Sequence, residues 1–291
     1  MSVAGDTAYL ASGLIERIEA NAIMGFTDGM IIGNLVDVKR YPSADKVSWQ
    51  VYNRGTHKLD SSDPGAVTDG TAISLKEFGS EKKQATLAPY GVASTVYMDS
   101  IYSSVEDPSP KVGQFLGNAM ASYIDKTIAE LFDDFNSGND CGTSSVGITV
   151  DDLFKAVSLL ENNYAPAPFR CVLDPRQING TYGLSNDLVT STQFGGSPSL
   201  QDEFLRNGFV QMVAGLPIYS SREVEEHGST SAYGCVFSEQ AIGLAFAGPQ
   251  DIWVTMQMEA LYQRVDYVAN AMFGVVEIDD YWGAMIDTKV A

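Results

Sequence analysis

The sequence has little of the material from which catalytic and metal sites are built. Among 291 residues there are three cysteines and two histidines. Cys141, Cys171 and Cys235 are dispersed without a CxxC spacing, so they indicate neither a disulfide framework nor a zinc site. His57 and His227 lie in polar, loop-like segments, and no G-x-S-x-G elbow, P-loop or GxGxxG motif accompanies them. We therefore expect no enzyme, no cofactor and no metal site.

Long apolar runs are also missing. The longest, such as "IGLAFAG" at 242–248, fall far short of the roughly 20 residues that cross a bilayer. The first 20 residues lack the basic and apolar regions of a signal peptide. With 45% hydrophobic and 19% charged residues, the composition is that of a folded globular protein. The sequence predicts no contact with a membrane and assembly in a cytoplasm-like compartment.

Positive charge is scarce, and it is unevenly placed. The chain has 18 basic and 37 acidic residues, a net charge of −19, which opposes tight binding of nucleic acid. Residues 39–83 are the exception: eight basic against six acidic residues give +2, whereas ten against 31 leave −21 on the remainder. We interpret this segment as a basic arm that lies across an acidic neighbouring subunit rather than across DNA.

The same segment has the pattern of an extended hairpin. In residues 46–55, Val47, Trp49 and Val51 fall on one side of an extended chain, with Tyr52 on the other. Residues 82–99 would return antiparallel after a middle rich in turn formers. A hairpin alone is marginal in water, so we expect this one to lie against another surface.

Helices are expected elsewhere in the chain. Apolar residues recur at helical spacing within 110–137, and about 25 helical residues would make a rod of roughly 38 Å that ends near Gly138. Thr149 is a plausible cap for a second helix, and "FRCVL" at 169–173 reads as a strand. Residues 1–40 show one plausible helix at 10–20 and suit an arm that borrows a neighbour's surface. From residue 251 onward the chain is mostly extended, and 258–268 could be partly helical.

Asp174 follows the strand at 169–173, where a carboxylate in an open sheet invites a catalytic interpretation. A structural role as a helix cap is better supported, because Asp before Pro175 is a standard start of a helix. The carboxylate there accepts hydrogen bonds from backbone N–H groups that have no partner within the helix. We therefore predict that Asp174 is a cap. The acidic stretch at 133–140 lacks the alternating ligands of a calcium loop, and we interpret it as a helix terminus.

The order of these elements resembles that of a known family. An arm, a long hairpin, a long helix, an α/β region and closing strands are similar to the HK97-type major capsid protein of tailed double-stranded DNA bacteriophages. The local resemblance is carried by "LLENNYAPAPFRCVLDP", "VAGLPIYSS", "YGCVFSEQAIGLAF" and "MFGVVEIDDYWGAMIDT". The resemblance implies an α+β, HK97-like capsid fold with this division: N-terminal arm 1–45, extended β-hairpin loop 46–100, peripheral domain 101–147 and 251–291 with a spine helix at 110–137, and axial α/β domain 148–250.

The resemblance also implies a function. The chain would assemble as pentamers and hexamers into an icosahedral shell that encloses phage DNA without sequence-specific binding. It would be a virion component assembled in the host cytoplasm, with a separate scaffolding protein, a portal and a decoration protein as partners. Some members cross-link through Lys and Asn, and several lysines of the hairpin are equally placed as donors. The expected inter-subunit contacts are Val47, Trp49, Val51, Tyr52, Arg54, Lys58, Lys82 and Lys83.

Two other interpretations stay open. An encapsulin-like nanocompartment would share the fold and enclose protein cargo instead of DNA. A soluble α/β hydrolase would be a monomer or a small oligomer with a pocket that contains His57 or His227. Particle formation separates the shells from the hydrolase, and a groove for a cargo peptide separates the two kinds of shell.

Overall fold

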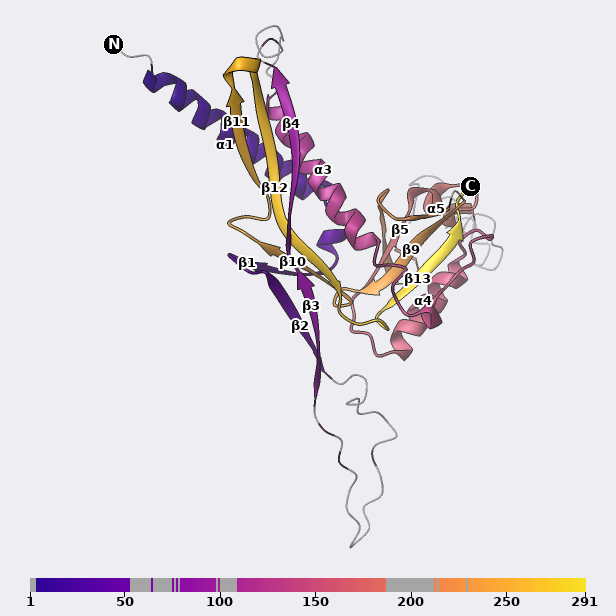
Figure 1. Cartoon of the computed structure of the whole chain (residues 1–291). Helices are drawn as coiled ribbons and strands as arrows, with labels where there is room; N and C mark the ends of the chain where they lie inside the picture. The colour runs from indigo at the N-terminus through magenta and orange to yellow at the C-terminus, as the bar shows by residue number, and fades with distance from the viewer. Residues whose placement is uncertain are drawn as a thin grey trace.

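The computed structural model describes residues 4–52, 64, 75, 77, 79–97, 99, 109–186, 212–213, 215–228 and 230–291. It combines two sheets with helices, which confirms the expected α+β class (Figure 1). The sheet that contains β12 (Arg264–Glu277) is covered by the helices α1 (Ala4–Gly29) and α3 (Ser109–Ala129), which pack on each other. The sheet that contains β9 (Ser231–Ser238) and β13 (Gly283–Lys289) lies beside the C-terminal end of α3 (Figure 1). A two-stranded hairpin leaves the body between them (Figure 1).

The first sheet is built around one long strand, β12 (Arg264–Glu277). Alternate residues of β12 are buried, because one face of the strand lies under helices while the other faces out. The strand order is β1-β10-β12-β11, and β4 also pairs with β12. The bounds are β1 Asp37–Tyr41, β4 Ala88–Tyr97, β10 Ile242–Ala247 and β11 Trp253–Glu259; β1 runs parallel to β10, and the other pairs are antiparallel.

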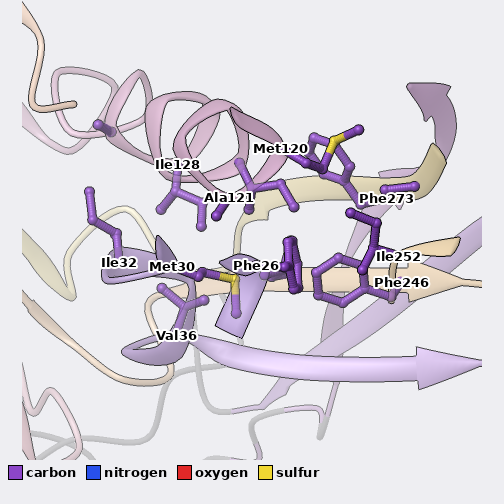
Figure 2. Packing of buried hydrophobic residues seen from close by; sticks show 14 of the residues in the cluster. Phe26, Met30, Ile32, Val36, Met120, Ala121, Ile128, Phe246, Ile252 and Phe273 are labelled. Carbon is purple, nitrogen blue, oxygen red and sulfur yellow. The ribbon is translucent and has the colours of Figure 1, made fainter. Parts of the chain in front are cut away.

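Two helices, α1 (Ala4–Gly29) and α3 (Ser109–Ala129), cover this sheet. Figure 2 shows where side chains of both helices meet those of the strands and of the short 3-10 helix η1 (Ile32–Asn34). The labelled members of this cluster are Phe26, Met30, Ile32, Val36, Met120, Ala121, Ile128, Phe246, Ile252 and Phe273. The main core of the chain is therefore shared by elements more than 200 residues apart.

The two helices approach backbone to backbone. A Cβ on Gly117 would lie 2.0 Å from the carbonyl oxygen of Ala22, and one on Gly113 would lie 2.5 Å from that of Ile18. Ile18, Ala22 and Phe26, which are four residues apart on one face of α1, are consequently buried. The sequence-based expectation that residues 1–40 borrow a neighbour's surface is wrong for this part of the arm. Gly113 and Gly117, four residues apart on α3, allow the contact, and a hydropathy pattern does not predict such a close approach of two helices.

The long helix is shorter than predicted. α3 ends at Ala129 and not near residue 137, and tighter backbone bonds follow: Leu131 N–H donates to Ile128 O at 3.1 Å, and Phe132 N–H to Ala129 O at 3.0 Å. These turns keep Phe132 and Phe135 buried, so the apolar spacing continues although the helix does not. A second 3-10 helix, η3 (Ser137–Asn139), comes next.

The second sheet has the order β13-β9-β5-β7-β6, with β8 paired to β9. α4 (Val150–Asn162) packs on it, and its apolar face shares a core cluster with the sheet. The expected cap is confirmed, because the Thr149 side chain accepts from Asp152 N–H and the Asp152 carboxylate accepts from Thr149 N–H. The bounds are β5 Phe169–Leu173, β6 Met212–Val213, β7 Leu216–Ser220, β8 Glu226–His227, β9 Ser231–Ser238 and β13 Gly283–Lys289.

Two strands lie in the opposite sheet from the one that the sequence-based division implies. β10 falls within 148–250 but belongs to the first sheet, and β13 falls within 251–291 but belongs to the second. Short connections, residues 239–241 and 278–282, carry the chain between the sheets. Both strands are apolar and β-prone, so their partners are decided by long-range packing and not by local pattern.

The predicted hairpin is present at its base. β2 (Lys46–Tyr52) pairs antiparallel with β3 (Ser80–Thr86), with Trp49 opposite Lys83. After Leu87 the chain continues as β4, which leaves the hairpin and joins β12. The returning stretch is thus two strands and not one. Near the far end of the first sheet, the 3-10 helix η5 (Ala260–Tyr262) lies in the part that the sequence left as possibly helical.

Candidate assembly surfaces

The hairpin base is tied to the body through Trp49. Its indole Nε1–H donates to Asp37 Oδ2 on β1 at 2.7 Å. The ring covers Gly243 on β10, where a Cβ would lie 2.6 Å from ring carbons, and Lys39 Nζ lies 4.5 Å from the ring centroid. Only glycine leaves room for an aromatic ring lying this close to a strand. The direction in which the hairpin leaves the molecule is therefore set by its own chain.

This arrangement corrects part of the expected contact set. Val47, Trp49 and Val51 are 4–6% exposed and belong to a core cluster of the chain itself, with Ala245 and Ile278 among its members. Their assignment as apolar contacts to a neighbouring subunit is wrong. Strand alternation shows that a face is buried, but it does not show which chain buries it.

The other members of the set remain predictions. Tyr52 is 51% exposed, Lys82 is exposed and Lys83 is half-buried. Arg54 and Lys58 lie outside the described residues. Tyr52 and Lys82 lie on the solvent side of the hairpin base, where a second chain could reach them, whereas Lys83 is opposite Trp49 and shares its face.

The hairpin base, β1 and connecting segments next to the second sheet line an open hollow of about 530 Å³. Its lining includes Asp37, Lys39, Trp49, Glu239 and Trp282. Charges of both signs line it, so it differs from the enclosed, mostly apolar pocket that holds a small molecule.

An acidic surface lies where α3 ends and β8 and β9 begin. Burial raises the pKa of Glu225, and the nearby charges of Asp133 and Glu130 raise it further. Burial likewise raises the pKa of Tyr233, with Asp287 and Asp133 adding to it. Burial is the larger cause of both pKa shifts, and the crowding of negative charges adds to it. The surface is a counterpart in charge for the basic arm of residues 39–83.

Comparison of the sequence with family models gave no match, and none was found among curated proteins either. Comparison of the structure gave many. The capsid of the cyanophage P-SCSP1u superposes with a TM-score of 0.64 at 18% identity, over 90% of this chain and 89% of that one. The capsid of Ralstonia phage GP4 gives 0.64 at 12%, over 88% and 87%. This chain has the fold of phage capsid proteins. A virus-like particle from Pyrococcus furiosus also matches, with a TM-score of 0.59 at 10% identity, over 94% and 98%.

Within this capsid fold, Asp174 has the structural role expected from the sequence. It is 3% exposed, it precedes α5 (Pro175–Asn179), and its carboxylate accepts from Arg176 N–H at 2.7 Å. Gln177 completes the cap by accepting from Asp174 N–H at 3.0 Å. Both Asp174 and Glu226 pair with the Arg176 guanidinium and raise its pKa further above the ordinary value. The capping prediction is confirmed.

Three side chains that organise the capsid fold carried no signal in the sequence. Buried Gln177 donates from Nε2 to Ala232 O at 2.9 Å and to Thr288 Oγ1 at 2.8 Å, which joins α5 to β9 and β13. Asp125 and Asn139, also buried, bind backbone groups far away in the chain. Each looks like an ordinary surface polar residue in sequence, because its partners are brought to it by folding.

The described histidine is not paired with a serine hydroxyl. His227 Nδ1 lies 3.2 Å from Asp287 Oδ2, and its ring stacks on Tyr233 at 4.8 Å. Ser231 Oγ donates to the backbone carbonyl of His227 and not to its ring. His57 lies outside the described residues. In the part of the chain that the structure describes, no group of three His, Cys, Asp or Glu is arranged to hold a metal, and no helix could cross a bilayer.

Proposed function

We propose that this chain is a capsid subunit that assembles as pentamers and hexamers into an icosahedral shell around phage double-stranded DNA. The observation that carries the proposal is the structural likeness to phage capsids over about nine-tenths of both chains. The shape of the molecule supports it, because the hairpin base, anchored by Trp49, points away from both sheets (Figure 1). A closed shell gives such a projection a surface on the next copy.

The proposed role is structural, without catalysis. His227 is held by Asp287 and Tyr233, and Asp174 is used as a helix cap. The three cysteines are buried, and burial raises the pKa of the Cys141 thiol to about 11, which keeps it protonated and unreactive near neutral pH. Asp174 and His227, the described groups that drew a catalytic interpretation, thus have structural tasks.

The partners follow from the same proposal. A separate scaffolding protein, a portal and a decoration protein would complete a virion built in the host cytoplasm. The net charge of −19 suits a wall that does not adhere to packaged DNA, since phosphate is repelled. The basic arm would then meet the acidic surface of a sister subunit and not the genome.

A second candidate is an encapsulin-like compartment filled with protein. It is favoured by the likeness to the virus-like particle from Pyrococcus furiosus, which covers 94% of this chain and 98% of that one. Both candidates are shells, so they differ only in what is enclosed. The open hollow beside the hairpin base is the described place where a bound cargo segment would be sought first.

Negative-stain microscopy and light scattering of the purified protein test the shell itself. Closed particles hundreds of ångströms across support it, whereas a 31.4 kDa monomer at all concentrations rejects it. Particles isolated from infected or expressing cells are then treated with nuclease and opened. Protected double-stranded DNA supports the capsid, and co-purified protein in place of DNA supports the compartment.

A further inference from the structure

β4 forms an unprotected edge of the first sheet. Among the described residues its only backbone partner is β12, and its ten residues span about 33 Å. The sequence of the strand, APYGVASTVY, contains no charged residue, although charged residues make up 19% of the chain. Proteins that stay single usually protect a long edge with Lys, a bulge or a covering element. This edge has the form of a surface meant to be paired.

The free hydrogen-bonding groups of β4 can be assigned. The carbonyl of Val268 on β12 accepts from the Thr255 hydroxyl on β11 at 3.4 Å, so the main chain of Val268 faces β11. Its partner Ala93 on β4 therefore points its own N–H and C=O away from β12. Pro89 is four residues before Ala93, so its main chain also points away from β12, and a residue without an N–H fits this outward position. By alternation, Gly91, Ala93, Thr95 and Tyr97 present their amides to solvent.

An apolar stripe on α3 lies next to this edge. Phe115, Ala119 and Tyr123 are four residues apart and exposed, with Phe115 at 67% and Tyr123 at 44%. Tyr123 contacts Tyr90 of β4, and the ring centroids are 5.2 Å apart. A strand added beside β4 would direct every second side chain toward the helix side, over this stripe. Main-chain bonds and an apolar floor are the two components of strand-addition sites.

The charges around this surface indicate the partner. The charged residues of α3 are Lys111, Asp125 and Lys126, and Asp125 is buried, so the exposed face of the helix carries cations only. Lys126 is paired with Glu130 at 4.0 Å, and Lys111 lies at the other end of the helix. An uncharged edge beside these residues does not repel a chain of net charge −19. The complementary molecule with extended, uncharged strands is this chain itself.

We propose that the outer edge of β4, with the Phe115–Tyr123 stripe as its floor, receives an extended segment of a second copy of the chain by strand addition. The identification of the partner as a second copy depends on the proposed shell function. The identification of the surface depends on the free edge of β4 and on the stripe. Pairing of β4 with β4 would be two-fold, and pairing with another segment would propagate head to tail and could close a ring.

Hydrogen exchange read out at single amides tests the pairing in whole particles against dissociated subunits. Gly91, Ala93, Thr95 and Tyr97 should exchange at least tenfold more slowly in particles, while Val92 and Ser94, which already face β12, change less. If particles form and the four outward amides exchange as fast as in subunits, the edge inference is overturned and the shell stands. If no self-association occurs, both are overturned.

Variants give a second readout. Ala93→Pro removes one outward donor, whereas Ala93→Ser keeps it and is the matched control. Ala93→Pro should raise the subunit concentration needed for assembly about tenfold, and Ala93→Ser should not. If far-UV circular dichroism shows that the proline variant does not fold, Phe115→Ser with Tyr123→Ser, on exposed sites, replaces it with the same expected shift. Normal assembly of a folded Ala93→Pro, or of the stripe variant, overturns the proposal.

Discussion

The carboxylate of Asp125 on α3 accepts the backbone N–H of Gly33 at 2.9 Å, although the two residues are 92 positions apart. It also accepts from Ile31 N–H at 2.7 Å, and it is 1% exposed. One side chain thus accepts two backbone N–H groups of the turn that leads from α1 into β1 and the hairpin. The contact holds the helical layer and the first sheet in a fixed relation.

Replacement of Asp125 by Asn should lower the free energy of unfolding by about 1–3 kcal/mol. The amide keeps the shape, but it presents a donor to one of the two backbone N–H groups. Asp125→Ala removes both acceptors and should cost more. Chemical denaturation at neutral pH measures the free energy of unfolding of the unchanged chain and of the two variants. Equal stabilities would show that the turn finds other partners.

The pH dependence of this group has a definite sign. Burial raises the pKa of Asp125, although bonds from Ile31 and Gly33 pull it down. The folded chain therefore holds the proton more tightly than the unfolded chain, whose aspartates titrate near about 3.9. The advantage of Asp125 over Asn in unfolding free energy should be largest below that pH, fall as pH rises to the raised pKa, and then stay level. An advantage that grows with pH would contradict the buried environment.

Gly117→Ala should destabilise the chain by about 1–3 kcal/mol, since the new methyl group would meet the carbonyl oxygen of Ala22 at 2.0 Å. Because the opposing atom is backbone, the helices must move apart. Ala119→Ser, on the exposed side of the same helix, is the control and should change stability by less than about 0.5 kcal/mol. Thermal unfolding compares them, and no difference would show that α1 and α3 separate freely.

Trp49→Phe should weaken the attachment of the hairpin base by about 1–2 kcal/mol, because Asp37 loses its indole donor while most of the apolar contact remains. Faster exchange of the amides of β2 and β3 would report it. Tyr52→Phe removes an exposed hydroxyl that donates to Gln50 Oε1, and it serves as the control. Identical exchange in both variants would mean that the bond to Asp37 does not hold the base.

Arg54→Glu with Lys58→Glu should reduce the yield of particles, and the loss should be greatest at low salt, where charge pairing is least screened. Far-UV circular dichroism should show that the double variant stays folded. Arg222→Glu, an exposed cation outside the basic segment, is the comparison for a reversed charge. Unchanged assembly and shell stability in the double variant would reject the basic arm as an inter-subunit contact.

Local patterns in the sequence were enough for the features that depend on neighbours along the chain. Alternation located β2, and cap chemistry located the starts of α4 and α5 at Thr149 and Asp174. These features involve residues within a few positions of each other, so their physics is present in any short window. The α+β class and the resemblance in element order followed from them.

Tertiary structure alone decided which chain and which sheet buries each apolar face. Val47, Trp49 and Val51 pack inside their own molecule because Gly243, nearly 200 residues away, leaves room for an indole. β10 and β13 lie in opposite sheets for a similar reason, since apolar strands of equal propensity accept any partner that packing offers. Asp125 and Gln177 act only across such distances. Periodicity records that a side chain is buried, whereas its partner is set by the long-range packing of the whole chain.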